Sequence, residues 1–120
     1  MHEMMIVDDS SLIRQKIERE CDHNMFKIVS SAVNGADAIT KYRDNFPEIV
    51  TMDLTMPNLD GIECIKSLID INPSCRILVI SALNDKETGI EALELGAMGF
   101  ITKPFSTVEL QEALREIISD

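Results

Sequence analysis

The sequence has few cysteines and histidines and no long apolar run, and each of these shortages argues against a class of protein. The three cysteines are odd in number and widely spaced in apolar contexts, which indicates reduced thiols rather than a disulfide framework or zinc site. His2 and His23 are too few and too isolated for a metal cluster. No apolar run approaches a membrane span and no N-terminal signal pattern appears, so we expect a cytoplasmic protein.

Basic residues are also scarce. Eleven lysines and arginines stand against 21 aspartates and glutamates, giving a net charge of −10 and a pI near 4.5. A surface this acidic repels phosphate backbones, which argues against direct nucleic-acid binding. Protein partners and cations remain compatible with it.

The apolar residues instead form five short runs that alternate with five amphipathic segments. The runs predict strands at residues 3–7, 25–31, 49–52, 76–80 and 98–101. The segments predict five helices. Two run over residues 10–22 and 60–72, one begins at 34, one begins at 84 and ends at a cap at Gly96, and the last begins at 106. This alternation predicts one α/β domain over residues 1–120, with a doubly wound parallel sheet and helices on both faces. The chain is then either a whole protein or a trimmed domain.

Two helix starts have clear capping signals. Asn34 followed by Asp37 resembles an N-cap pair, and Ser106 with Glu109 forms a capping box. The inward positions are predicted as Ala36, Ile39 and Tyr42 in the helix from 34, and as Leu110, Leu114 and Ile117 in the helix from 106.

Polar residues follow four of the five strands. Asp53 comes directly after the buried run at 49–52, and the other three strands are followed by Asp8 and Asp9, by Ser81, and by Lys103. A single aspartate at a strand end is most often a turn cap. The carboxyl ends of parallel strands share one edge of a sheet, however, so we expect these side chains to form one site.

The chemistry of this set is that of phosphoryl transfer. Two carboxylates about 4 Å apart repel by roughly 4 kcal/mol at an effective dielectric of about 20, so three of them require a cation. Hard oxygen ligands favour Mg²⁺ or Mn²⁺. Lys103 supplies a mobile positive charge that can pair with Asp53 and later with a bound phosphate. Ser81 supplies a hydroxyl donor for a phosphoryl oxygen, beside a carboxylate nucleophile.

These motifs resemble those of response-regulator receiver domains, more narrowly the CheY-like ones of chemotaxis-type single-domain regulators. The matching residues are Val7-Asp8-Asp9-Ser10, the run 53–57 with Asp60-Gly61, Ser81-Ala82 and Lys103-Pro104-Phe105. The likeness covers essentially all 120 residues in order and spacing. It implies a flavodoxin-like sheet with strand order 2-1-3-4-5.

The resemblance also implies a role for each residue of the set. Asp53 would accept a phosphoryl group from a phosphohistidine of a sensor histidine kinase. Asp8, Asp9 and Asp53, with the backbone carbonyl of Thr55, would hold Mg²⁺. Ser81 would be the switch hydroxyl, and Lys103 the lysine of the family pattern, followed by a cis bond to Pro104.

Phe100 falls at the position of the family's switch aromatic, where tyrosine would supply a phenol that this chain lacks. A purely core role for Phe100 is equally open. As a switch it would couple the site to the face made by the helix from 84, the strand 98–101 and the helix from 106, where a downstream target would dock. The protein would then be a monomer or a phosphorylation-dependent dimer, would act in chemotaxis, and would not be an enzyme in the ordinary sense.

Four other interpretations were weighed. Haloacid-dehalogenase-like phosphatases need a second aspartate two residues after the nucleophile, where this chain has Thr55. A nucleotide- or flavin-binding domain needs a phosphate loop where Asp8 and Asp9 stand. A degenerate scaffold would not need the complete acid, hydroxyl and lysine set. The fourth interpretation, a receiver domain cut from a larger transcriptional or enzymatic regulator, remains compatible with the sequence. Within the receiver interpretation, Leu83 could shield the phosphoryl group from water.

Overall fold

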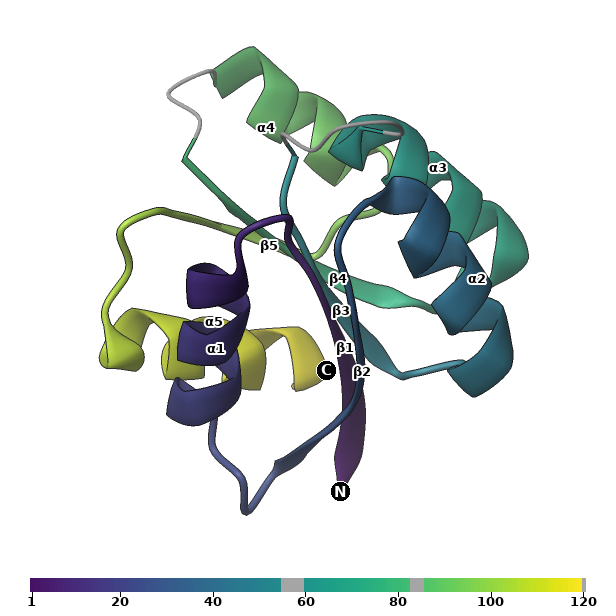
Figure 1. Ribbon diagram of the computed structural model, residues 1–120. Coiled ribbons are helices and arrows are strands. Elements are labelled where there is room, and N and C mark those ends of the chain that lie inside the picture. The colour runs from purple at the N-terminus through teal and green to yellow at the C-terminus, as the bar shows by residue number, and fades with distance from the viewer. Residues whose placement is uncertain (55–59, 83–85, 120) are drawn as a thin grey trace.

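The computed structural model describes residues 1–54, 60–82 and 86–119, in which strands and helices alternate (Figure 1). The strands are β1 (His2–Val7), β2 (Phe26–Ala32), β3 (Ile49–Met52), β4 (Arg76–Ser81) and β5 (Gly99–Thr102). The helices are α1 (Ser11–Glu20), α2 (Gly35–Asn45), α3 (Gly61–Ile71), α4 (Lys86–Glu94) and α5 (Thr107–Ile118). All paired strands are parallel, in the order β2-β1-β3-β4-β5, which confirms the predicted fold class.

The helices cover both faces of the sheet, with α1 and α5 on one side and α2, α3 and α4 on the other (Figure 1). Successive strand residues point to opposite faces, so a strand covered on both sides must be apolar throughout. In β1, Met4 and Ile6 pack with α1 and α5, while Met5 and Val7 pack with the opposite helices. No helix of the described ranges is long and apolar enough to span a membrane.

Most predicted boundaries lie within two residues of those observed. The helix expected over 10–22 begins after its cap, Ser10, and ends before Cys21. The last strand is shifted by one residue, so that Met98 lies outside it and is exposed. The expected start of the fourth helix at Asn84 lies outside the described residues.

The predicted caps are confirmed. The Asn34 side chain accepts a hydrogen bond of 2.8 Å from the Asp37 N–H, and Ser106 and Glu109 bond reciprocally, each at 3.0 Å. Gly96 has a φ of +122°, a conformation that favours glycine after a helix.

The inward face predicted for α2 was partly wrong. Leu110, Leu114 and Ile117 of α5 are buried as expected, and so is Tyr42. Ala36, however, is exposed, and Ala38 occupies the buried position. The buried positions of α2 are Gly35, Ala38 and Tyr42, whose spacings of three and four residues define the helix face against the sheet.

All three cysteines are buried and free, as predicted. Burial raises the pKa of Cys64 to about 12 and that of Cys75 to about 11. Both thiols therefore stay neutral in the folded protein at pH values where an unfolded chain would ionise them.

We expect this difference to make the fold sensitive to alkali. An unfolded thiol titrates near pH 8.5, so the contribution of Cys64 and Cys75 is complete below that pH and is lost as the pH rises toward their folded pKa values. Between pH 8 and pH 10.5, the wild type should lose about 5 kcal/mol more unfolding free energy than Cys64→Ala/Cys75→Ala, because each of the two thiols contributes about 2.5 kcal/mol. Urea unfolding at both pH values measures this, and equal losses would contradict it.

Candidate functional site

Backbone hydrogen bonds between neighbouring strands continue beyond the strand ends and hold the backbone of three predicted site residues in place. The Asp8 N–H donates to the Ala32 carbonyl (3.1 Å), and the Asp53 N–H donates to the Val7 carbonyl (3.0 Å). The Lys103 N–H donates to the Ser81 carbonyl (2.9 Å). The backbone therefore presents these residues along one edge of the sheet before any side chain is considered.

Three carboxylates converge there. Asp8 and Asp53 are 1% and 2% exposed, Asp9 is exposed to solvent, and ligand oxygens from all three lie within 4.8 Å of one another. At that separation each pair repels by about 3 kcal/mol if the effective dielectric is about 20. The Asp cluster expected from the sequence is therefore present, and it suits a cation.

Lys103 is the counter-charge within this cluster. Its ammonium lies 2.8 Å from Asp8 Oδ2 and 3.6 Å from Asp53 Oδ2, and its side chain is 15% exposed. The sequence suggested Asp53 as its partner, whereas the shorter contact is with Asp8. One ammonium among three carboxylates leaves a local charge near −2. The Lys103–Pro104 peptide bond is cis, as the resemblance implied.

Ser81 and Phe100 lie close to the same edge but at different depths. Ser81 is fully buried at the end of β4 and is in register with Thr102. Phe100 is in register with Val79, is partly buried, and packs against the core under α2, α3 and α4. Both the core and the switch interpretation of Phe100 fit this position. Thr55 and Leu83 lie outside the described residues.

The structure adds Arg14, which the sequence did not single out, and gives a physical reason for Gly61, which the sequence named only as part of a motif. The Arg14 guanidinium donates to the Asp8 carbonyl at 2.7 Å, so α1 braces the first acidic residue. A Cβ at Gly61 would collide with the backbone of Leu54 and lie 2.5 Å from the Asp53 carbonyl oxygen. Only glycine lets α3 begin this close to the residue that follows β3.

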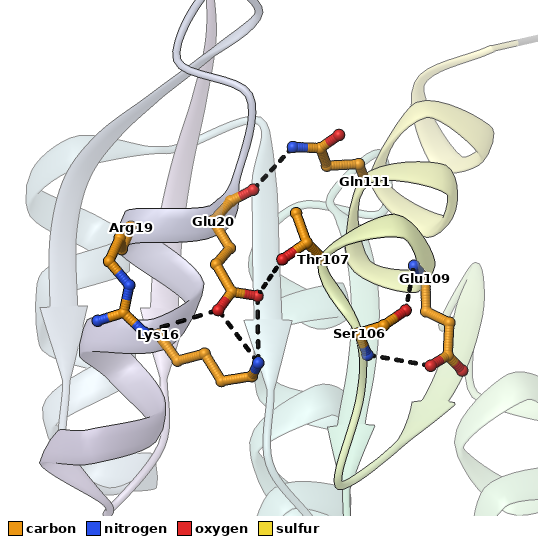
Figure 2. Close-up of polar contacts among 7 residues, drawn as sticks. All are labelled: Lys16, Arg19, Glu20, Ser106, Thr107, Glu109 and Gln111. Carbon is orange, nitrogen blue, oxygen red and sulfur yellow. Dashed lines mark hydrogen bonds and ion pairs between the residues drawn. The ribbon is translucent and has the colours of Figure 1, made fainter.

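A polar contact between α1 and α5 supports the segment after Lys103 (Figure 2). The Thr107 hydroxyl donates to Glu20 Oε1 at 2.7 Å, and Lys16 bonds both Glu20 oxygens at 3.1 Å. These hydrogen bonds, that of Thr107 most, hold the pKa of Glu20 below its ordinary value. The Lys16 ammonium also lies 4.8 Å from the centroid of the Phe105 ring. The turn between β5 and α5 is therefore anchored to α1.

A doubly wound parallel sheet with clustered carboxylates and a lysine at its carboxyl edge defines a class of α/β protein with an acidic, cation-compatible site. The profile of the response regulator receiver domain matches residues 4–115. The chain belongs to this family. It is therefore a receiver domain of two-component signalling, a switch rather than a catalytic enzyme.

Individual relatives agree with this assignment. The chain is 38% identical to the chemotaxis protein CheY of Bacillus subtilis over 118 residues, 98% of each chain. It is 38% identical to CheY of Thermotoga maritima over 95% of each chain. It also matches, with 36% identity, 34% of a protein-glutamate methylesterase/protein-glutamine glutaminase of Halalkalibacterium halodurans.

The fold agrees equally well with solved structures. The CheX–CheY–BeF₃–Mg²⁺ complex of Borrelia burgdorferi contains a chain with a TM-score of 0.93 and 28% identity, covering 99% of this chain and 90% of that one. The response regulator domain of Thermotoga maritima CheB has a TM-score of 0.87 and 30% sequence identity, and the match covers 100% of this chain and 98% of that one. Receiver domains imply a histidine kinase and a downstream target as partners.

Proposed function

We propose that this chain is a single-domain chemotaxis regulator, cytoplasmic and spanning residues 1–120, which is switched by phosphorylation of Asp53. The main observation behind the proposal is that the buried Asp53, which directly follows β3, lies within reach of Lys103 and beside Asp8 and Asp9. The near full-length likeness to CheY proteins supports the chemotaxis assignment. Three free, buried cysteines suit a reducing compartment.

In the transfer step, an Asp53 carboxylate oxygen forms the bond to phosphorus as the bond from phosphorus to the imidazole of a kinase phosphohistidine breaks. Lys103 then turns from the carboxylates toward the new phosphoryl oxygens, and Ser81 donates its hydroxyl to one of them. The buried position of Ser81 at the end of β4 supports that role.

The donor set fits Mg²⁺. Asp8, Asp9 and Asp53 supply the hard carboxylate oxygens that this ion prefers, and the carbonyl of Thr55 is a further proposed ligand. Bound there, the ion would neutralise charge on the phosphoryl oxygens. Mn²⁺ has the same ligand preference and is the second choice.

The output face consists of α4, β5 and α5. Phe100 of β5 packs against Gly89 of α4, where an added Cβ would lie 3.0 Å from Phe100 Cε2. Movement of Ser81 toward the phosphoryl group would let this ring move inward and change the face that a downstream target reads. The protein would act as a monomer or as a phosphorylation-dependent dimer.

Intact mass after incubation with acetyl phosphate tests the proposal directly. We expect one phosphoryl adduct with Mg²⁺ and none after chelation, because the acidic cluster repels an anionic donor unless its charge is offset. Peptide mapping should place the adduct on Asp53. An adduct elsewhere, or one indifferent to Mg²⁺, would contradict the assignment.

One alternative has a specific observation behind it. The segment matched in the methylesterase is only 34% of that protein, so the same domain also occurs within larger regulators. If this chain is such a piece, the site chemistry is unchanged and its output is an attached domain.

A further inference from the structure

The helices of this protein carry their charge unevenly. Helices α1, α2 and α3 together contain six acidic and six basic residues, so their charges balance. Helices α4 and α5 contain six acidic residues against two basic ones. The net negative charge of the helices is therefore concentrated on the two that border β5.

Ion pairs also involve a larger share of the carboxylates on the first three helices. There Glu20, Asp37 and Glu63 pair with lysines, and the other three acidic residues form no ion pair among the described residues. Across the part of the chain that the structure describes, Glu91, Glu94, Glu109, Glu112 and Glu116 form no ion pair and are exposed. Their charge is therefore available to a partner.

An apolar surface lies between α4 and β5. Gly89, Ile90, Leu93 and Phe100 line a shallow hollow of about 290 Å³. Ile90 and Leu93 are 54% and 45% exposed, although both are large apolar side chains. Contiguous exposed apolar residues of this kind mark an interaction surface more often than isolated ones do.

The acidic row on α4 borders this hollow through Glu94. Glu94 directly follows Leu93 and lies about 100° from it around the helix, whereas Glu91 lies about 160° from both Leu93 and Gly89. Glu94 is also four residues after Ile90 and shares its side of the helix. A segment seated on Ile90 and Leu93 would therefore have the Glu94 carboxylate within reach of its flank.

The acidic residues of α5 lie on the side of that helix away from α1. Thr107 and Gln111 contact Glu20 of α1 and so define the α1 side (Figure 2). Three glutamates are rotated roughly 100–160° from Gln111, namely Glu109, Glu112 and Glu116. Ile117, between these two sides, packs against the position of Gly99 in β5. The acidic row of α5 therefore reaches toward β5 through Glu109 and Glu116, whereas Glu112 lies about 160° from the buried Leu110 and Leu114 and faces away from the sheet.

We infer that the α4–β5–α5 face binds a basic amphipathic segment of a partner protein, with apolar anchors on Ile90, Leu93 and Phe100 and lysines or arginines facing both acidic rows. The inference rests on the proposed output role of this face and adds the chemistry of its partner. Charge complementarity carries it, because an acidic segment would meet like charge from both sides.

Two labelled synthetic peptides test the inference. They share leucines at helical spacing and differ only in having lysine or glutamate at the flanking positions. Fluorescence anisotropy is measured with the full chain, before and after beryllofluoride and Mg²⁺. We expect the lysine peptide to bind at least tenfold more tightly than the glutamate peptide, and its affinity to fall with added salt. Equal affinity for the two peptides would overturn the inference.

Matched variants separate a built surface from general attraction to an acidic protein. Glu94→Lys/Glu116→Lys should weaken binding of the lysine peptide about tenfold. Glu18→Lys/Asp44→Lys makes the same change in net charge on α1 and α2 and should leave the affinity within twofold. Equal weakening by both variants would overturn the inference.

Acetyl phosphate labelling of the same preparations keeps this test apart from that of the proposed function. A normal adduct with no preference for the lysine peptide rejects only the basic partner. A missing adduct with the preference intact rejects the phosphorylation role and leaves the binding surface in place.

Discussion

Asp53→Asn is expected to accept no phosphoryl group from acetyl phosphate and, in the absence of Mg²⁺, to be more stable than the wild type by about 1 kcal/mol. The carboxamide has nearly the shape of the carboxylate but lacks the anionic oxygen that attacks phosphorus. It also removes one of three clustered negative charges. Lys103 keeps its shorter ion pair, which is with Asp8, and the substitution removes only its 3.6 Å ion pair with Asp53.

Mg²⁺ should reverse the order of stability. Ligand binding to the folded state adds free energy that grows with the ratio of ion concentration to dissociation constant, and the variant has lost one proposed ligand. Intact mass and urea unfolding, each with Mg²⁺ and with a chelator, measure both effects. Asp44→Asn, on the exposed surface of α2, is the control and should match the wild type in all four conditions. A phosphoryl adduct on Asp53→Asn would refute the assignment of the acceptor.

The location of the site could be predicted from the sequence because it depends on topology more than on side-chain packing. Once the strands were recognised as parallel, Asp8, Asp53 and Lys103 had to approach one edge, and backbone hydrogen bonds place them there. The partner of Lys103 could not be predicted in the same way. The choice between Asp8 and Asp53 depends on side-chain distances of 2.8 and 3.6 Å.

Contacts between elements far apart in sequence were also beyond prediction. Glu20 and Thr107 are 87 residues apart, and no local pattern pairs them. Gly61 follows a cap residue and reads as an ordinary helix start, although the actual constraint is the approach of α3 to Leu54. Ala36 was expected inside because alanine fits an apolar face, but its place on the helix turns it toward solvent.

Lys103→Ala should destabilise the metal-free protein by about 3 kcal/mol, and saturating Mg²⁺ should recover most of that loss. The ammonium is the counter-charge 2.8 Å from the buried Asp8 carboxylate, and its removal leaves three carboxylates without their lysine. Urea unfolding with and without Mg²⁺ measures both quantities. Lys66→Ala is the control, because its pair with Glu63 is exposed and its loss should cost less than about 1 kcal/mol.

The same variant separates phosphorylation from switching. With Mg²⁺ present, Asp53 of Lys103→Ala keeps its nucleophilic oxygen and should still gain the phosphoryl group. The phosphoryl oxygens would then lack the ammonium that draws the end of β5 toward the site, so Phe100 should keep its unphosphorylated environment. ¹⁹F NMR of protein labelled with fluorophenylalanine reports that environment before and after phosphorylation. A wild-type shift of the Phe100 signal in Lys103→Ala would show that the lysine does not transmit the signal, and Ser81 would then be the remaining link between Asp53 and the output face.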